Sequence, residues 1–98
     1  MKIVWSPLAI DRAAEIAAFI SSDNPAAARE WLDKIFAKIA LLSSSPEIGR
    51  VVPEIERKEI REIIFGNYRI IYRLESVSIS ILTIRHGKQL LPVDEILT

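Results

Sequence analysis

The fold is decided by residues 58–86, KEIREIIFGNYRIIYRLESVSISILTIRH, because apolar side chains alternate along three successive runs of this stretch. Alternation of this kind predicts half-buried β-strands, whose side chains point in turn to opposite faces of a sheet. Gly66-Asn67 separates the first two runs, and a glycine in this place suits a two-residue hairpin loop. Glu75-Ser76 is a second turn candidate. The stretch therefore predicts a three-stranded antiparallel meander.

Two-residue loops determine which residues face each other across the strands. Across the first turn the predicted pairs are Phe65–Tyr68, Ile63–Ile70 and Arg61–Tyr72. Across the second turn they are Tyr72–Ile79, Ile70–Ile81 and Tyr68–Thr83.

This register assigns the side chains to two faces. One face is the expected core, made of Ile63, Phe65, Tyr68, Ile70, Tyr72, Leu74, Val77, Ile79 and Ile81. The other face is mixed and is expected to lie open to a partner: Ile60, Glu62, Ile64, Arg69, Ile71, Arg73, Ser78, Ser80, Leu82, Ile84 and His86. Arg61 and Arg85 fall on the core side and should reach outward at the edge, unless a one-residue bulge moves either of them.

A helical hairpin is predicted before the meander. Met1–Trp5 alternates as a short strand, and Ser6-Pro7 is typical of a helix start, with serine as N-cap and proline in the first turn. That helix is expected to run to about Ser22. Asn24-Pro25 repeats the device and opens a second helix that ends near Ser43. Its apolar stripe consists of Ala28, Trp31, Leu32, Ile35, Phe36, Ile39 and Leu42.

The predicted order is β-α-α-β-β-β, an α+β fold in one domain, residues 1–98, with the helical hairpin packed on one face of a small, mainly antiparallel sheet. The N-terminal strand should join this sheet, since alone it would have no partner. Residues 47–57 are expected to form a loop. In residues 87–98, Pro92 is compatible with a final helical turn or an edge strand.

Composition excludes several classes of protein. The chain has no cysteine and one histidine, so a disulfide framework or thiolate metal site is excluded, and neither a metal nor a cofactor is expected. No apolar run approaches the roughly 20 residues of a membrane span, and a soluble cytoplasmic protein is expected. The net charge is zero, with 13 basic and 13 acidic residues. Strong electrostatic binding to nucleic acid usually requires a more basic domain.

Three polar side chains of the mixed face are candidates for chemistry. Arg69 and Arg73 are two strand positions apart, where arginines are usually solvated or paired, here with Glu62, or contact phosphates and carboxylates. His86 is either a surface residue at a strand end or a general acid or base. A serine hydrolase would need His86 as its base, but no serine occupies a recognisable nucleophile context.

The ordered motifs resemble the RelE/ParE superfamily of type II toxin–antitoxin toxins, also described as plasmid-stabilisation proteins. The resemblance covers residues 1–88. It rests on Trp5-Ser6-Pro7-x-Ala9, Asn24-Pro25-x-Ala27-Ala28, Ser45-Pro46-x-x-Gly49-Arg50, Arg61-Glu62, Asn67-Tyr68-Arg69-Ile70-Ile71-Tyr72 and Ile84-x-His86.

The resemblance implies the fold described above and a cognate antitoxin whose C-terminal segment wraps the toxin across the helices and sheet. Binding to operator DNA would take place only through that antitoxin. The surface expected to bind the antitoxin or the target comprises Arg50, Arg61, Arg69, Arg73, Ile64, Ile71 and Leu82.

The superfamily divides by target. RelE-like members cut messenger RNA on the ribosome, and in that case Arg69, Arg85 and His86 would be the catalytic residues, since Arg69 matches the Tyr-Arg-Ile pattern. ParE-like members poison DNA gyrase. The C-terminal tyrosine common in RelE-like nucleases is missing from residues 87–98, and only Arg57 and Lys58 represent a lysine-rich loop. The resemblance therefore favours the gyrase branch, with the ribosome-dependent nuclease and a weakly toxic or inactive antitoxin-binding member as alternatives.

Overall fold

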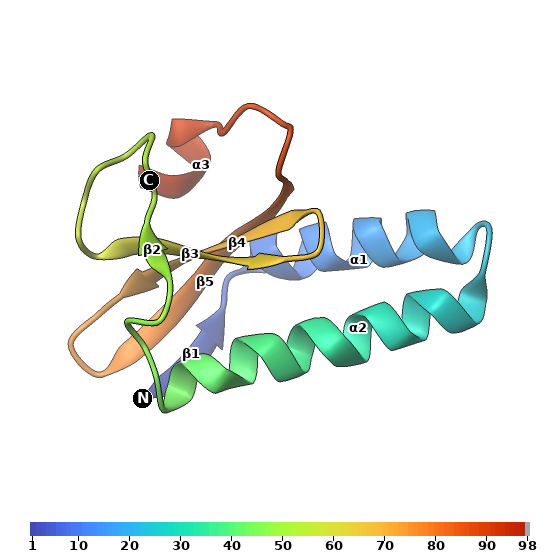
Figure 1. Cartoon of the computed structure of the whole chain (residues 1–98), viewed down its shortest axis with the longest axis horizontal. Coiled ribbons are helices and arrows are strands. Elements are labelled where there is room, and N and C mark those ends of the chain that lie inside the picture. The colour runs from blue at the N-terminus through green and yellow to red at the C-terminus, as the bar shows by residue number, and fades with distance from the viewer. Residues whose placement is uncertain (98) are drawn as a thin grey trace.

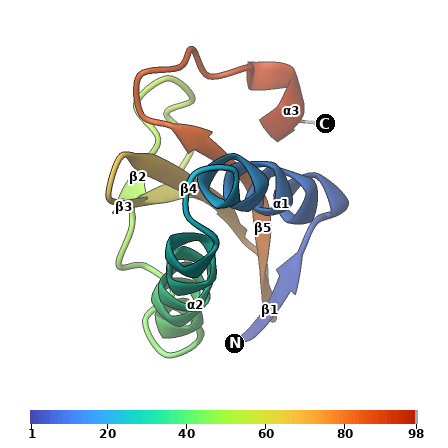
Figure 2. The same ribbon diagram turned by 90° about the vertical axis from the view of Figure 1, so that its right-hand side faces the viewer.

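The computed structural model describes residues 1–97, which form a five-stranded sheet with two long helices on one face (Figure 1). Figure 2 looks along these helices. The elements in chain order are β1 (Lys2–Trp5), α1 (Pro7–Ser21), α2 (Pro25–Ala40), the 3-10 helix η1 (Leu41–Ser43), β2 (Arg50–Val51), β3 (Ile60–Phe65), β4 (Tyr68–Leu74), β5 (Ser78–His86) and α3 (Val93–Leu97).

The strands lie in the order β1-β5-β4-β3-β2. β1 runs parallel to β5, and the remaining neighbours are antiparallel. This is the predicted α+β fold, with the N-terminal strand in the same sheet and a helical turn in the segment that contains Pro92. β2 is an additional short edge strand within residues 47–57, which were expected to form a loop. No helix within residues 1–97 is both long enough and apolar enough to cross a membrane.

Both long helices begin as predicted. The Ser6 hydroxyl accepts a hydrogen bond from the Ala9 amide at 3.0 Å, and the Asn24 side chain accepts one from the Ala27 amide at 3.1 Å. A proline follows each cap, where its missing N–H costs nothing. The buried side chains of α1 are alanines, Ala9, Ala13 and Ala17, so its backbone can lie close to the sheet.

The first hairpin has the predicted register. Phe65 pairs with Tyr68, Ile63 with Ile70 and Arg61 with Tyr72. Gly66 has a φ of 58°, a left-handed conformation that glycine adopts at little cost. Local turn chemistry is therefore sufficient to set this pair of strands.

The second turn lies one residue further along the chain than predicted, so the predicted pairs Tyr72–Ile79, Ile70–Ile81 and Tyr68–Thr83 are wrong. The observed partners are Tyr72–Ile81, Ile70–Ile84 and Tyr68–His86. The Glu75 carboxylate accepts hydrogen bonds from the hydroxyls of Ser78 and Ser80, which stabilise a turn centred on Ser76 and Val77. Val77 is consequently exposed rather than in the core.

A β-bulge in β5 changes the face of every residue after it. Tyr72 pairs with Ile81 but Ile71 pairs with Thr83, so one extra residue, Leu82, is accommodated in β5. The Leu82 carbonyl accepts a hydrogen bond from the Ser6 hydroxyl at 2.9 Å. The bulge therefore has a polar partner at the start of α1.

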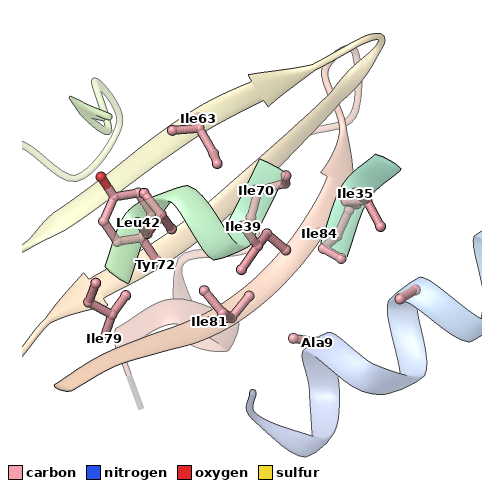
Figure 3. Close-up of a cluster of buried hydrophobic side chains, with 11 residues drawn as sticks. Ala9, Ile35, Ile39, Leu42, Ile63, Ile70, Tyr72, Ile79, Ile81 and Ile84 are labelled. Carbon is pink, nitrogen blue, oxygen red and sulfur yellow. The ribbon is translucent and has the colours of Figure 1, made fainter. Parts of the chain in front are cut away.

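The bulge corrects the predicted positions of three residues. Ile84 belongs to the buried cluster beneath the helices (Figure 3), and His86 pairs with Tyr68. Both had been predicted on the mixed face. Arg85, expected on the core side unless a bulge moved it, pairs with Arg69 and lies on the same face as Arg69. The bulge is the cause of this change of face.

Each face of the sheet carries a hydrophobic cluster. The larger one lies under α1 and α2 and consists of Ala9, Ala13, Ile35, Ile39, Leu42, Ile63, Ile70, Tyr72, Ile79, Ile81 and Ile84 (Figure 3). The smaller one consists of Val52, Ile60, Ile71 and Ile96, with Ile55, Leu82 and Leu91 packed around it. We call this opposite face the second face. The chain itself covers much of it, with residues from the loop before β3 and from α3.

Tyr72 anchors the loop between the helices and β2. Its buried hydroxyl accepts a hydrogen bond from the Gly49 amide and donates one to the Pro46 carbonyl, both at 2.9 Å. A Cβ atom at Gly49 would lie 2.5 Å from that hydroxyl and 2.6 Å from the Glu62 carbonyl oxygen. Glycine is therefore required for this close approach.

Replacement of Tyr72 by phenylalanine should lower the free energy of unfolding by about 1–3 kcal/mol, because it leaves the buried Gly49 amide and the partly buried Pro46 carbonyl without this partner. Urea denaturation monitored by circular dichroism measures the change. Tyr68→Phe is the matched control, since the Tyr68 hydroxyl makes no hydrogen bond within residues 1–97, and it should change stability far less. Equal effects of the two substitutions would contradict the anchoring role.

Candidate functional site

Arg69 is buried on the second face, and each of its three side-chain nitrogens donates a hydrogen bond to one of two carboxylates. Its Nε donates to Glu62 at 2.6 Å, and its two Nη atoms donate to the two oxygens of Glu54 at 2.7 and 2.9 Å. Paired, planar contacts of this kind are the strongest that a guanidinium makes. The pKa of Arg69 is raised, chiefly by its hydrogen bonds to Glu54. Arg69 is therefore held as a structural cation.

Glu62 joins Arg69 to a second arginine. Its side chain is 0 % exposed, and it also accepts a hydrogen bond from Arg50 Nε at 2.6 Å. A buried carboxylate needs such compensation because desolvation of an isolated charge is costly. Glu54, nearer the surface, has its pKa lowered to about 2, mainly by the hydrogen bonds from Arg69. These four residues link the loop before β3 to β2, β3 and β4.

Arg73 and Arg85 hold the C-terminal segment. Arg73 donates to the Ile96 carbonyl at 2.9 Å, and Arg85 donates to the Glu95 carboxylate at 3.4 Å and to the Leu90 carbonyl at 3.2 Å. The other oxygen of Glu95 accepts from Arg12 of α1 at 2.7 Å. The pKa of Arg12 is raised, first of all by this hydrogen bond to Glu95.

His86 lies in a different environment from Arg69. Its ring packs edge-on against Tyr68, with ring centroids 5.7 Å apart, and its Nδ1 accepts a hydrogen bond from the Lys88 amide at 3.2 Å. An open cavity of about 460 Å³ borders the ring, lined by Arg12, Glu15, Ile16, Phe19, Tyr68, Ile84, Arg85, His86 and Gln89. Arg69 does not line this cavity. Of the three predicted catalytic residues, Arg85 and His86 share it, and Arg69 is paired elsewhere.

The predicted binding residues are only partly accessible. Ile64 is 51 % exposed and the Arg50 side chain reaches solvent. Arg61 donates to the Gly49 carbonyl at 2.9 Å at the edge of the sheet. Ile71 is fully buried, so the expectation of an open apolar face is wrong at this position. Leu82 is half-buried and lies at the margin of the smaller cluster. The physical reason is that the loop before β3, through Val52 and Ile55, and the C-terminal segment, through Ile96, bury this face.

A second apolar surface lies between the two long helices. It is a groove of about 500 Å³ lined by Trp5, Ile10, Ala13, Ala14, Leu32 and Phe36. Ile10 is 54 % exposed and Phe36 is 49 % exposed, with the Phe36 ring 5.2 Å from that of Trp5. We call this the helix groove. Helical spacing alone predicted Phe36 in the buried stripe and did not single out Ile10.

Three residues of the charged networks were not identified from the sequence: Arg12, Glu54 and Glu95. Arg12 and Glu95 are 83 positions apart, so no short motif connects them. The available signal was an arginine one position before Ala13, on a helix whose fully buried residues are alanines.

The comparison with known families decides the class of the protein. The family described as "ParE toxin of type II toxin-antitoxin system, parDE" matches residues 3–91. The chain belongs to the ParE toxin family. This confirms the resemblance to the RelE/ParE superfamily and identifies the chain as the toxin of a type II toxin–antitoxin system. No curated protein matches the chain.

A solved structure supports the fold of this ParE toxin. The structure titled "Chromosomal ParDE TA system from P. aeruginosa" is similar with a TM-score of 0.75 and 19 % sequence identity. The similarity covers 90 % of this chain and 97 % of the other. The ParE fold is therefore shared while most side chains differ.

In this ParE toxin, Arg69→Ala should lower the free energy of unfolding by about 3–5 kcal/mol, because it leaves the buried Glu62 carboxylate with less compensation. Chemical denaturation at pH 7 measures the loss. Arg57→Ala is the control, since Arg57 forms an exposed pair with Glu59 and its removal should cost less than about 1 kcal/mol. If Arg69→Ala changed the free energy of unfolding as little as Arg57→Ala does, the Arg69 ion pairs would contribute little to stability.

Proposed function

We propose that this ParE toxin arrests growth by poisoning DNA gyrase and that a cognate ParD-type antitoxin neutralises it. The family match over residues 3–91 is the observation that carries the proposal. The zero net charge of the chain agrees with a protein target, since docking on ribosomal RNA favours a basic surface.

The pairing of Arg69 supports gyrase over messenger RNA as the target. An arginine that stabilises a phosphate in cleavage must present free donors to it. Here Nε and both Nη atoms of Arg69 already bind Glu62 and Glu54. Two of the five N–H donors of Arg69 are uncommitted, but the side chain is only 9 % exposed and its charge is already balanced by two carboxylates. A phosphate would therefore have to compete with Glu54 and Glu62 for this guanidinium.

The helix groove supports an antitoxin that binds as an amphipathic helix. Apolar grooves between helices accept the apolar side chains that recur every three or four residues along such a helix. Ile10 and Phe36 at the rim are half-exposed large side chains, and their burial by the antitoxin would be favourable. We therefore propose the helix groove, rather than Ile71 and Leu82, as the main apolar contact.

The target is tested with purified toxin in two assays. One contains gyrase, supercoiled plasmid and ATP; the other contains programmed ribosomes and a defined messenger RNA. We expect trapped double-strand breaks in the first and an intact messenger in the second. His86→Ala should leave gyrase poisoning within about twofold, since a poison that acts by contact needs no general acid or base. Cleavage at the A-site codon would overturn the proposal, and inactivity in both assays would favour a weakly toxic or inactive member.

The antitoxin site is tested by Phe36→Glu. A charge placed in the groove should weaken antitoxin binding at least about 100-fold, because burial of an unpaired carboxylate is strongly unfavourable. Titration calorimetry with the purified antitoxin measures the affinity. Ile48→Glu is the matched control at an exposed apolar position outside the groove, and it should bind as the parent does. Equal affinities of both variants would place the antitoxin elsewhere.

A further inference from the structure

The second face of the sheet is an apolar surface that residues 89–97 cover. We call these residues the cover. Ile96 of α3 enters the cluster formed with Val52, Ile60 and Ile71, and Leu91 packs at its margin. In Figure 1 α3 lies on the side of the sheet away from the two long helices. If the cover were absent, Ile60 and Ile71 would lose a main part of their protection from water.

Few contacts hold the cover in place. Ile96 is its fully buried side chain, whereas Leu90, Val93 and Leu97 are exposed. α3 has five residues, too few to be stable as a helix on its own. The remaining attachment is polar. Three arginines on three different elements bind the cover, and Gln89 exchanges two hydrogen bonds with the backbone of His86.

Those arginines form a carboxylate site. Arg12 of α1 and Arg85 of β5 form ion pairs with the two carboxylate oxygens of Glu95, at 2.7 and 3.4 Å respectively. Arg73 of β4 fixes the next residue through the Ile96 carbonyl at 2.9 Å. Arg12, Arg85 and Glu95 are all partly exposed, and partly exposed ion pairs each contribute modestly. The cover should therefore open at a lower free energy than the whole fold.

From this arrangement we infer that the cover detaches as a unit and that the surface beneath it is a second binding surface. The partner that it fits is a peptide segment with an acidic residue beside a large aliphatic one, the chemistry of Glu95-Ile96 itself. Its carboxylate would bind Arg12 and Arg85, and its aliphatic side chain would occupy the place between Ile60 and Ile71. The inference does not depend on the cellular target of the toxin.

The experiment uses cysteine labelling in the chain of 98 residues, which contains no cysteine of its own. Ile71→Cys reports on the second face, and Ile70→Cys, at the adjacent position of β4, reports on the face beneath the helices. Both isoleucines are fully buried, so the pair is matched in residue type, strand and exposure. Labelling of each introduced thiol by a maleimide requires the structure above it to open.

We expect the thiol of the Ile71→Cys variant to react at least about tenfold faster than that of Ile70→Cys, because local opening exposes position 71 and only larger unfolding exposes position 70. Addition of Glu95→Gln should raise the labelling rate at position 71 about fivefold and the rate at position 70 by no more than that factor, because larger unfolding breaks the same ion pairs. Position 71 should therefore remain at least about tenfold faster in both backgrounds. Glu15→Gln is the control, since Glu15 also pairs with Arg12 but does not belong to the cover. Equal rates at the two positions in all backgrounds would overturn the detachable cover.

The binding surface is tested with a synthetic peptide of residues 90–97. In the chain carrying Ile71→Cys and Glu95→Gln, the peptide should slow the labelling of the introduced thiol. A peptide concentration of about millimolar is needed, because the peptide competes with the tethered cover, whose effective concentration is also about millimolar. The same peptide with glutamine in place of the glutamate should have a weaker effect. If neither peptide changes the rate while the cover still opens, the surface does not bind such a segment and that part of the inference fails.

Discussion

The burial of the Glu62 carboxylate is the constraint on which the second face depends. A charge without exposed surface must be compensated where it lies, and Arg69 and Arg50 do this from the adjoining strands β4 and β2. The Nε of Arg69 binds Glu62, and its two Nη atoms bind Glu54 of the loop before β3. These hydrogen bonds hold that loop against the sheet. With that loop in place, Val52 and Ile55 complete the cluster that Ile96 enters. The ion pairs thus organise a surface whose apolar part would otherwise be open.

The two faces consequently differ in what they offer to other molecules. The helix side has an apolar groove with half-exposed side chains, whereas the second face uses its arginines internally. Arg69 occupies the position of an arginine that acts on RNA in the RelE-like branch of the superfamily. In this chain its side chain is paired with Glu62 and Glu54. Residue identity at a motif position is therefore weaker evidence for an activity than the partners that the side chain has.

Sequence patterns predicted what depends on neighbouring residues. The helix starts at Ser6 and Asn24, the turn at Gly66-Asn67 and the apolar face of the first hairpin all follow from local chemistry. The second turn and the bulge did not follow. A shift of one residue at the turn depends on the Glu75 carboxylate, and the bulge depends on a serine 76 positions away from Leu82. The misplacement of Ile84 and His86 has this single cause, because one inserted residue exchanges the faces of all that come after it.

Ser6 illustrates how such distant contacts limit sequence variation. Its oxygen accepts a hydrogen bond from Ala9, and its proton is donated to the Leu82 carbonyl, so both functions of one hydroxyl are in use. Asn24 caps the second helix through an acceptor alone. Aspartate is in general an equally good N-cap residue, and it could replace Asn24, where only an acceptor is needed. At position 6 an aspartate would be ionised at neutral pH and could not donate a hydrogen bond to the Leu82 carbonyl. Among ParE toxins that share this bulge, the first cap should therefore be restricted to hydroxyl side chains, while the second tolerates the wider set.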